Sequence, residues 1–355
     1  MGQFGITGSS PSVCVGKGIA FRAWGKEARD LSQNQGVSFD TNGSPVGQRW
    51  ERVPRPHSCA GKRRPVQGCR HQGLYETGEC PTYWLVQDSG DWLLLSGGGN
   101  AGFATVYAAK KLGIPATIIV PTSTPQATVQ KMEEQGTEVQ VFGKVWDDAY
   151  AKALALAETE GWVSIHPFDH PLIWQGHASM VRELKDSLGH KPGAIVLAVG
   201  GGGLLAGVVA GLQDVGWQDV PIIAVETKGA DSFNAAIKAG RLVTLPEITS
   251  VAKCLGAKTV SARALECASE CQVISQLVED VEAVQAVELF LDDERMLVQP
   301  ACGAPLALLY TGRVQQLQRE GHLNPGLDSI VVIVCGGSSI QLAGLWALKT
   351  QLGMK

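Results

Sequence analysis

Four consecutive glycines, Gly200, Gly201, Gly202 and Gly203, stand between an apolar run at 194–199 and a second apolar stretch that begins at Leu204. This pattern predicts a buried strand, a glycine turn and a buried helix. Because glycine has no Cβ, several backbone N–H groups can converge in such a turn, and the N-terminus of the following helix adds partial positive charge. Four glycines exceed what a tight turn needs, so the sequence predicts a phosphate-binding loop.

The residues around the four glycines exclude two common kinds of phosphate loop. A Walker loop requires a lysine and a serine or threonine after its last glycine, whereas Leu204 and Leu205 follow here. A dinucleotide-binding loop needs an acidic residue further along, and Glu226 stands at a suitable distance. The glycine spacing does not fit that fingerprint, however, and no second mononucleotide-binding half is evident.

The composition is that of a globular protein with room for two lobes. The chain has 355 residues, of which 45% are hydrophobic, and its formal net charge is −4. This charge gives no basic field for nucleic acid, and no apolar run reaches the length of a membrane span. Nine cysteines without framework spacing, and an N-terminus unlike a secretory signal, lead us to expect a cytoplasmic protein with no nucleic-acid or membrane partner.

Short β-rich runs alternate with helical patterns after residue 96. Such alternation, with continuously apolar strands, predicts an α/β protein whose parallel sheets are flanked by helices. The range 1–96 shows no such alternation and is rich in Gly, Ser, Pro, Arg and Gln, which predicts an irregular or disordered leader. The expected strands are 114–120, 138–142, 162–165, 194–199, 221–226 and 329–334. The expected helices are 101–112, 124–135, 145–159, 172–188, 203–214, 281–294, 303–319 and 339–352.

Two further loops follow apolar runs. Ser96, Gly97, Gly98, Gly99 and Asn100 come after a short run at 92–95 and open a helical pattern, for which we expect Asn100 to be the cap. The N–H groups of this loop suit a carboxylate, and the Asn100 amide suits a phenolic oxygen. The apolar run 330–334 ends at Cys335, whose thiol is placed to approach a cofactor; a buried cysteine is otherwise a small apolar filler.

The three loops, together with four sequence segments, make the chain resemble the fold-type II pyridoxal-phosphate enzymes. Within that group it is similar to the L-serine/L-threonine dehydratases. The segments are KLGIPAT at 111–117, PFDHPLIW at 167–174, PACGA at 300–304 and VCGG at 334–337. The resemblance implies a two-lobed, tryptophan synthase β-like fold with pyridoxal 5′-phosphate between the lobes. It divides the chain into a leader at 1–96, an incomplete small domain at 97–168 and a large cofactor-binding domain at 169–355.

The resemblance also implies a role for each matching residue. The phosphate cup corresponds to Gly200, Gly201, Gly202, Gly203 and Leu204. The partner of the pyridine hydroxyl corresponds to Asn100, and that of the pyridine nitrogen to Cys335. The substrate carboxylate site corresponds to Ser96, Gly97, Gly98, Gly99 and Asn100. The positions that hold a monovalent cation, such as potassium, correspond to Glu226, Ala230 and Leu255.

The activity implied by the resemblance is β-elimination of a small amino acid. L-Serine would give pyruvate and ammonia, and L-threonine would give 2-oxobutanoate and ammonia. The family further implies a homodimer and a place in L-serine catabolism and gluconeogenesis. Two alternatives remain open at this point, namely a catalytically inactive homologue, and a serine racemase or β-replacement synthase of the same fold.

One residue that the chemistry requires is missing from its expected place. A lysine must form the Schiff base with the cofactor and move the α-proton. The family carries it in a Ser-x-x-Lys-x-Arg-Gly stretch, and the corresponding position lies near Leu74, where no lysine is found. Lys62 partly fits the motif, between Ser58 and Arg64, and is the candidate. The alternative is that residues 1–96 derive from a misassembled or alternatively spliced transcript, which would leave the chain inactive.

Overall fold

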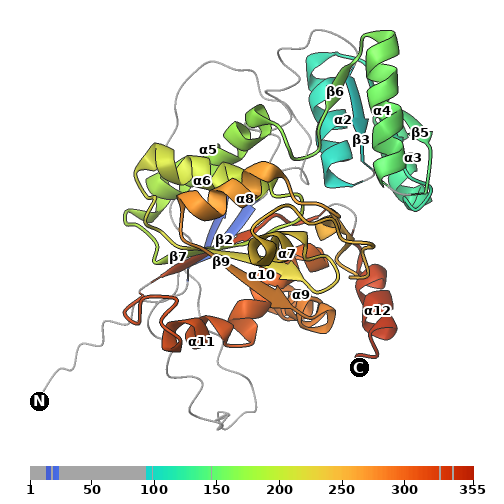
Figure 1. The fold of residues 1–355 in the computed structure, drawn as a ribbon. Coiled ribbons are helices and arrows are strands. Elements are labelled where there is room, and N and C mark those ends of the chain that lie inside the picture. Colours follow the sequence, from blue (N-terminus) through green and yellow to red (C-terminus); the bar gives the residue numbers. More distant parts are fainter. Residues whose placement is uncertain are drawn as a thin grey trace, which may run out of the picture.

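Two β-sheets, each covered by helices, organise the chain (Figure 1). The computed structural model describes residues 13–16, 19–23, 93–97, 99–144, 146–327, 329–337 and 340–355. Within these residues the smaller sheet has four strands and the larger has six. The four-stranded sheet and its helices form a lobe of their own at the upper right of Figure 1. The expected α/β class with parallel sheets flanked by helices is therefore confirmed.

The four-stranded sheet is parallel throughout, in the order β5-β4-β3-β6. Its strands alternate with helices along the chain. Leu93 and Leu95 pack on one face among side chains of α2 and α3, whereas Leu94 packs on the other face against Ala149 and Ala153 of α4. Burial on both faces explains why the central strands are continuously apolar. The elements are β3 (Leu93–Ser96), α2 (Asn100–Leu112), β4 (Ala116–Val120), α3 (Gln126–Glu133), β5 (Glu138–Val141), α4 (Trp146–Glu160) and β6 (Val163–Ile165).

The six-stranded sheet has the order β1-β2-β10-β7-β8-β9. The four strands from β10 to β9 are parallel, and β2 pairs antiparallel with β10. The strands are β1 (Val13–Gly16), β2 (Ile19–Ala23), β7 (Ala194–Ala198), β8 (Ile222–Thr227), β9 (Val273–Val278) and β10 (Ile330–Val334).

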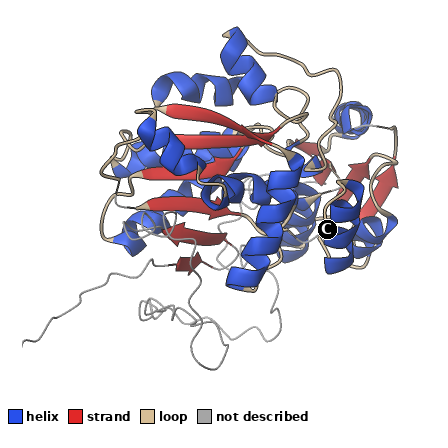
Figure 2. Cartoon of the chain, turned by 90° about the horizontal axis from the view of Figure 1, so that it is seen from below, coloured by secondary structure: helices blue, strands red, loops and turns tan. Residues whose placement is uncertain are grey.

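Helices cover both faces of this larger sheet (Figure 2). Ile195 and Leu197 of β7 pack with α5 (Pro171–Leu188), α6 (Gly203–Val215) and α8 (Ala262–Glu270). The alternate residues Ala194 and Val196 pack with α9 (Asp280–Glu294) and α10 (Pro300–Tyr310) on the opposite face. The remaining elements are α7 (Ser232–Ala239), the short 3₁₀ helix η3 (Lys253–Leu255), α11 (Arg313–Arg319) and α12 (Leu342–Gln351).

The structure differs from the sequence-based elements in three respects. The helix expected at 303–319 is two helices, because Gly312 adopts a left-handed conformation with φ 71° between α10 and α11. The strand β9 and the helices α7 and α8 were not predicted. The range 1–96 contributes β1, β2 and β3, so its last strand belongs to the four-stranded sheet. None of the helices within the described residues is long and apolar enough to cross a membrane.

Candidate active site

Three glycine-containing loops stand at the carboxyl ends of parallel strands. Residues 96–100 begin with the last residue of β3, residues 200–203 follow β7, and residues 335–337 follow β10. In open parallel sheets this edge is where ligands bind. A hydrogen bond from Asn100 Nδ2 to Gln299 Oε1, at 3.0 Å, connects the first loop to α10 of the larger lobe. This bond joins the first loop to the lobe that carries the other two loops.

The tetraglycine loop has the form of an anion-binding turn. Gly202 is the N-cap of α6 in a left-handed conformation, with φ 94°. Among the described residues, the N–H groups of residues 200–205 have no backbone acceptor, and Ala206 N is the first to donate, to Gly202 O at 2.9 Å. A run of unpaired N–H groups at the start of a helix is suited to a phosphate. The residues present thus fit the phosphate group predicted from the sequence.

Neighbouring side chains leave no space for anything larger than glycine in this loop. A Cβ on Gly201 would lie 2.4 Å from the Phe168 ring, and one on Gly202 would lie 2.4 Å from Ala264 Cβ. The Ser261 N–H also donates to Gly201 O at 3.0 Å and anchors the loop to the segment before α8. The loop is therefore held between two protein surfaces.

The loop at 96–100 differs in one detail from the sequence prediction. Gly99, and not Asn100, is the N-cap of α2, and no side chain caps this helix. Asn100 is instead the first helical residue and directs its amide to Gln299. The prediction that Asn100 caps the helix is wrong, because this amide bonds to another part of the chain. Gly98 lies outside the described residues.

This loop also offers donors to a carboxylate. The Gly97 N–H donates to Ile119 O at 2.9 Å and fixes the loop to β4. Among the described residues, the N–H groups of Gly99, Ala101 and Gly102 have no backbone acceptor. The Ser96 side chain is buried, and its Oγ has no hydrogen-bond partner in the described part of the chain. A small anion at the start of α2 would satisfy these groups.

The third loop holds two neighbouring thiols. Cys335 follows β10 and is exposed, whereas Cys302 on α10 is buried, with its Sγ 3.4 Å from Gly336 O. A hydrogen bond between the two thiols raises the pKa of Cys302 and lowers that of Cys335. Cys302 therefore keeps its proton, and the Cys335 sulfur is the acceptor of the pair.

Gln299, which no sequence pattern pointed to, contacts two of the three loops and reaches the third through Cys254. Its Oε1 accepts from Asn100 Nδ2 and, at 3.2 Å, from Cys254 Sγ. Its backbone N–H donates to Gly336 O at 3.2 Å. The carbonyl oxygen of Cys254 lies 3.1 Å from the position that a Cβ on Gly200 would take. The only signal in the sequence is that Gln299 directly precedes the segment PACGA.

An aromatic cluster, formed by Trp146, Tyr150, His166 and Phe168, connects the first loop to the tetraglycine loop. Trp146 Nε1 donates to Ser96 O at 3.0 Å, and its ring stacks on Tyr150 with centroids 4.9 Å apart. The His166 and Phe168 rings meet edge to face at 4.6 Å. Of these four residues, only Phe168 lies in a segment singled out from the sequence, PFDHPLIW.

His166 within this cluster is held in its neutral form. Its Nδ1 accepts from the Asp169 N–H at 2.8 Å and therefore carries no proton. Burial lowers the pKa of His166 further from its ordinary value. The aromatic cluster thus presents an uncharged wall beside the loops.

The three residues matched to a cation site lie around the end of β8. Glu226 is fully buried and accepts N–H groups from Phe233 at 2.9 Å and Asn234 at 2.7 Å, at the start of α7. Ala230 lies in the turn after β8, and Leu255 ends η3 close to Gly200. Within the described residues, no group of three or more His, Cys, Asp and Glu side chains is arranged to hold a metal ion.

Lys62 lies outside the described residues. Among the residues that are described, no lysine ammonium donates a hydrogen bond to any of the three loops.

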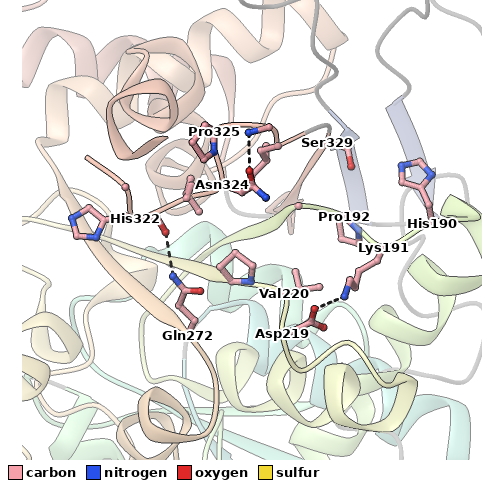
Figure 3. A pocket seen from close by; sticks show the side chains of 16 residues that line it. His190, Lys191, Pro192, Asp219, Val220, Gln272, His322, Asn324, Pro325 and Ser329 are labelled. Atoms are coloured by element: carbon pink, nitrogen blue, oxygen red, sulfur yellow. Dashed lines mark hydrogen bonds and ion pairs between the residues drawn. The ribbon is translucent and has the colours of Figure 1, made fainter. Parts of the chain in front are cut away.

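A cavity of about 570 Å³ lies at the opposite edge of the larger sheet (Figure 3). It is lined by residues at the amino ends of the strands, including Pro192, Pro221 and Ser329. Lys191 and Asp219 form an ion pair in it, and Gln272 Nε2 donates to His322 O at 3.1 Å. Because the glycine loops stand at the carboxyl ends, this cavity is separate from the candidate site.

Comparison with known proteins agrees with the site. Residues 76–336 match the family described as pyridoxal-phosphate dependent enzyme, and the chain belongs to this family. The match begins within the range 1–96.

The individual relatives are more specific. The chain is 66% identical to the serine dehydratase-like protein of Rattus norvegicus, over 73% of this chain and 79% of that protein. It is 54% identical to the L-serine dehydratase/L-threonine deaminase of Homo sapiens, over 84% of both. The L-serine ammonia-lyase of Rhizomucor miehei shares its fold with a TM-score of 0.70 and 38% identity, over 77% of this chain and 86% of that one.

Proposed function

We propose that this protein is a pyridoxal-phosphate-dependent L-serine/L-threonine dehydratase. It would convert L-serine to pyruvate and ammonia, and L-threonine to 2-oxobutanoate and ammonia. The observation that carries the proposal is that Gln299 joins the first and third loops directly, while Cys254 links it to the tetraglycine loop. The identity to proteins named for this activity supports it.

Each loop would hold one part of the cofactor. The N–H groups of residues 200–204 suit its phosphate, the Asn100 amide suits its ring hydroxyl, and Cys335 suits its ring nitrogen. When bound, pyridoxal phosphate supplies an electron sink for the electrons released at the α-carbon. A thiol is a weak proton donor, so Cys335 leaves the ring nitrogen without a full positive charge, which favours elimination over transamination.

The first loop would bind and orient the amino acid. The N–H groups of Gly99, Ala101 and Gly102 and the buried Ser96 hydroxyl are donors for the substrate carboxylate. The aromatic cluster covers the side of the site between Ser96 and Phe168, and neutral His166 adds no charge there. This arrangement favours a small amino acid with a neutral side chain.

The proposal requires a lysine that forms the Schiff base, and Lys62 is the candidate from the sequence. Borohydride reduction of the protein with pyridoxal phosphate, followed by peptide mapping, tests it. We expect a pyridoxyl group on one defined lysine, and loss of both label and pyruvate formation in Lys62→Ala. The matched controls are Lys17→Ala and Lys26→Ala, which alter the other two lysines that precede Asn100.

The second candidate is a catalytically inactive homologue, and the absence of a lysine near Leu74 favours it. No specific adduct, together with no ammonia from serine or threonine, would establish this alternative. D-Serine in place of pyruvate would instead indicate a racemase, and a new β-substituted amino acid formed with an added nucleophile would indicate a synthase.

The remaining features of the proposal rest on the family resemblance. We infer that the small domain at 97–168 and the large domain at 169–355 enclose the cofactor, and that the protein is a cytoplasmic homodimer. The five cysteines whose side chains are described are all free thiols, which supports a reducing compartment. Sedimentation equilibrium tests the dimer.

On the same resemblance we propose a monovalent cation, such as potassium, at Glu226, Ala230 and Leu255. The Glu226 carboxylate and the two carbonyl oxygens would be its ligands. Activity in potassium buffer, compared with tetramethylammonium buffer, tests this site.

A further inference from the structure

The side chain of Gln299 occupies a central position among the three loops. Gln299 is the buried N-cap residue of α10. Its amide oxygen, Oε1, accepts two hydrogen bonds, one from Asn100 Nδ2 at 3.0 Å and one from Cys254 Sγ at 3.2 Å. A Cβ on Gly337 would lie 2.3 Å from Gln299 Cγ, so the side chain is also packed against the third loop. Gln299 thus has little freedom to rotate.

These two hydrogen bonds determine the orientation of the side-chain amides of Gln299 and Asn100. Cys254 is exposed as a residue, but desolvation of its thiol raises the pKa of Cys254 to about 11, so the thiol stays protonated and donates. An oxygen that receives this proton must be Oε1, and the amide of Asn100 must then offer its NH₂ group to the same atom. Gln299, at the start of α10, therefore fixes the orientation of the Asn100 side-chain amide.

We propose that Gln299 is a positioning residue that makes Asn100 a hydrogen-bond donor toward the ring hydroxyl of the cofactor. The inference rests on the proposed function, and it names a residue that acts through Asn100 and does not itself touch the cofactor. Without Gln299, the Asn100 amide can rotate by half a turn and present its oxygen, which would repel an oxygen of the ligand. Gln299 would thereby couple α10 of the larger lobe to α2 of the smaller one.

The test uses a cofactor analogue that needs no lysine. The compound 4′-deoxypyridoxine 5′-phosphate keeps the phosphate and the ring hydroxyl but has no aldehyde, and its 3-deoxy counterpart also lacks the ring hydroxyl. Fluorescence titration gives the affinity of the full-length protein for each. In Gln299→Met, which keeps the length of the side chain but removes the amide, we expect about fivefold weaker binding of the first compound and unchanged binding of the second.

Two comparisons separate positioning from a general loss of structure. Gln316→Met makes the same chemical change at an exposed position of α11. Within the described residues, the Gln316 side chain bonds only to Glu320, so both affinities should stay unchanged. Asn100→Ala should weaken binding of the first compound, and adding Gln299→Met to it should cause no further loss. The ratio of the two affinities within one variant is independent of how much of that protein is folded.

Two outcomes would overturn the inference. Equal weakening of both compounds in Gln299→Met would show that Gln299 only supports the fold. Additive losses in the double variant would show that it does not act through Asn100. If the parental protein binds neither compound, the cofactor site itself is wrong, and the proposed function fails together with the inference.

Discussion

Replacing Gly201 with alanine tests whether the Phe168 ring determines the need for glycine in the tetraglycine loop. The added Cβ would lie 2.4–2.5 Å from three atoms of that ring. Ordinary contacts between carbon atoms are about 3.5–4.0 Å, so either the loop or the ring must move by about 1 Å. The ring cannot move freely, because it meets His166 edge to face at 4.6 Å and the Phe168 backbone accepts from Trp174 Nε1 at 3.0 Å.

The expected magnitude follows from the cost of overpacking. An extra methyl group in a well-packed site lowers the free energy of unfolding by about 1–3 kcal/mol. If the clash with the ring is the cause, the same change made in a Phe168→Ala background should cost less than about 0.5 kcal/mol, because the space is then open. The coupling between the two substitutions should therefore be about 1–3 kcal/mol.

Urea unfolding of the cofactor-free protein at fixed pH measures this coupling. Gly344→Ala is the matched control, since it lies inside α12 and a Cβ there meets only Ile340 Cδ1 at 3.6 Å. That change should raise the free energy of unfolding by about 0.5–1 kcal/mol. Additive effects of Gly201→Ala and Phe168→Ala would refute the reasoning, as would a Gly201→Ala protein of unchanged stability.

Three further predictions concern buried ionisable groups. Burial raises the pKa of Glu226 to about 8, so the folded protein keeps a proton that the unfolded chain loses above its ordinary pKa of 4.5. In buffer free of potassium, the free energy of unfolding should then fall between about pH 5 and 8, by at most about 1.4 kcal/mol per pH unit. Urea titrations in that buffer should show a smaller fall in Glu226→Gln. Burial lowers the pKa of His177 to about 4, so the unfolded chain takes up the proton first, and stability should fall as the pH drops from about 6.5 to 4. His177→Gln should remove that loss, and an identical acid limb in both proteins would contradict the prediction. Lys349 is buried on α12, and its Nζ lies 2.6 Å from Glu288 Oε1 of α9. Thermal unfolding of Lys349→Ala should therefore show a free energy of unfolding lower by about 1–2 kcal/mol, because Glu288 loses its partner. The double variant Lys349→Met with Glu288→Gln should lose less.

The features predicted correctly from the sequence are those that neighbouring residues encode. The run 194–199 and the glycines after it predicted β7 and the start of α6, because an apolar strand and a glycine turn are both local patterns. The loops that end at Asn100 and begin at Cys335 were predicted in the same way. The local pattern gave the wrong role only for the Asn100 side chain.

The features that were missed depend on contacts between distant parts of the chain. Gln299 stands 199 positions from Asn100, and no local pattern reports that pairing. The strand β9 has few fully buried residues and lies at one edge of the sheet, so its apolar signal is weak. The prediction of one helix at 303–319 missed the break at Gly312, because a glycine lowers helix propensity but does not exclude a helix.

The pairing of β2 with β10 has a consequence for how the protein is made. The four-stranded sheet comes from one continuous stretch, between Leu93 and Ile165, and can assemble soon after it leaves the ribosome. The strand β2 has to wait for β10, roughly 300 residues later, which at ordinary rates of translation is a delay of about 15–60 s. During that interval an unpaired strand edge is open to chaperones and to other chains. The yield of folded protein should therefore depend on the speed of synthesis of the second half of the chain.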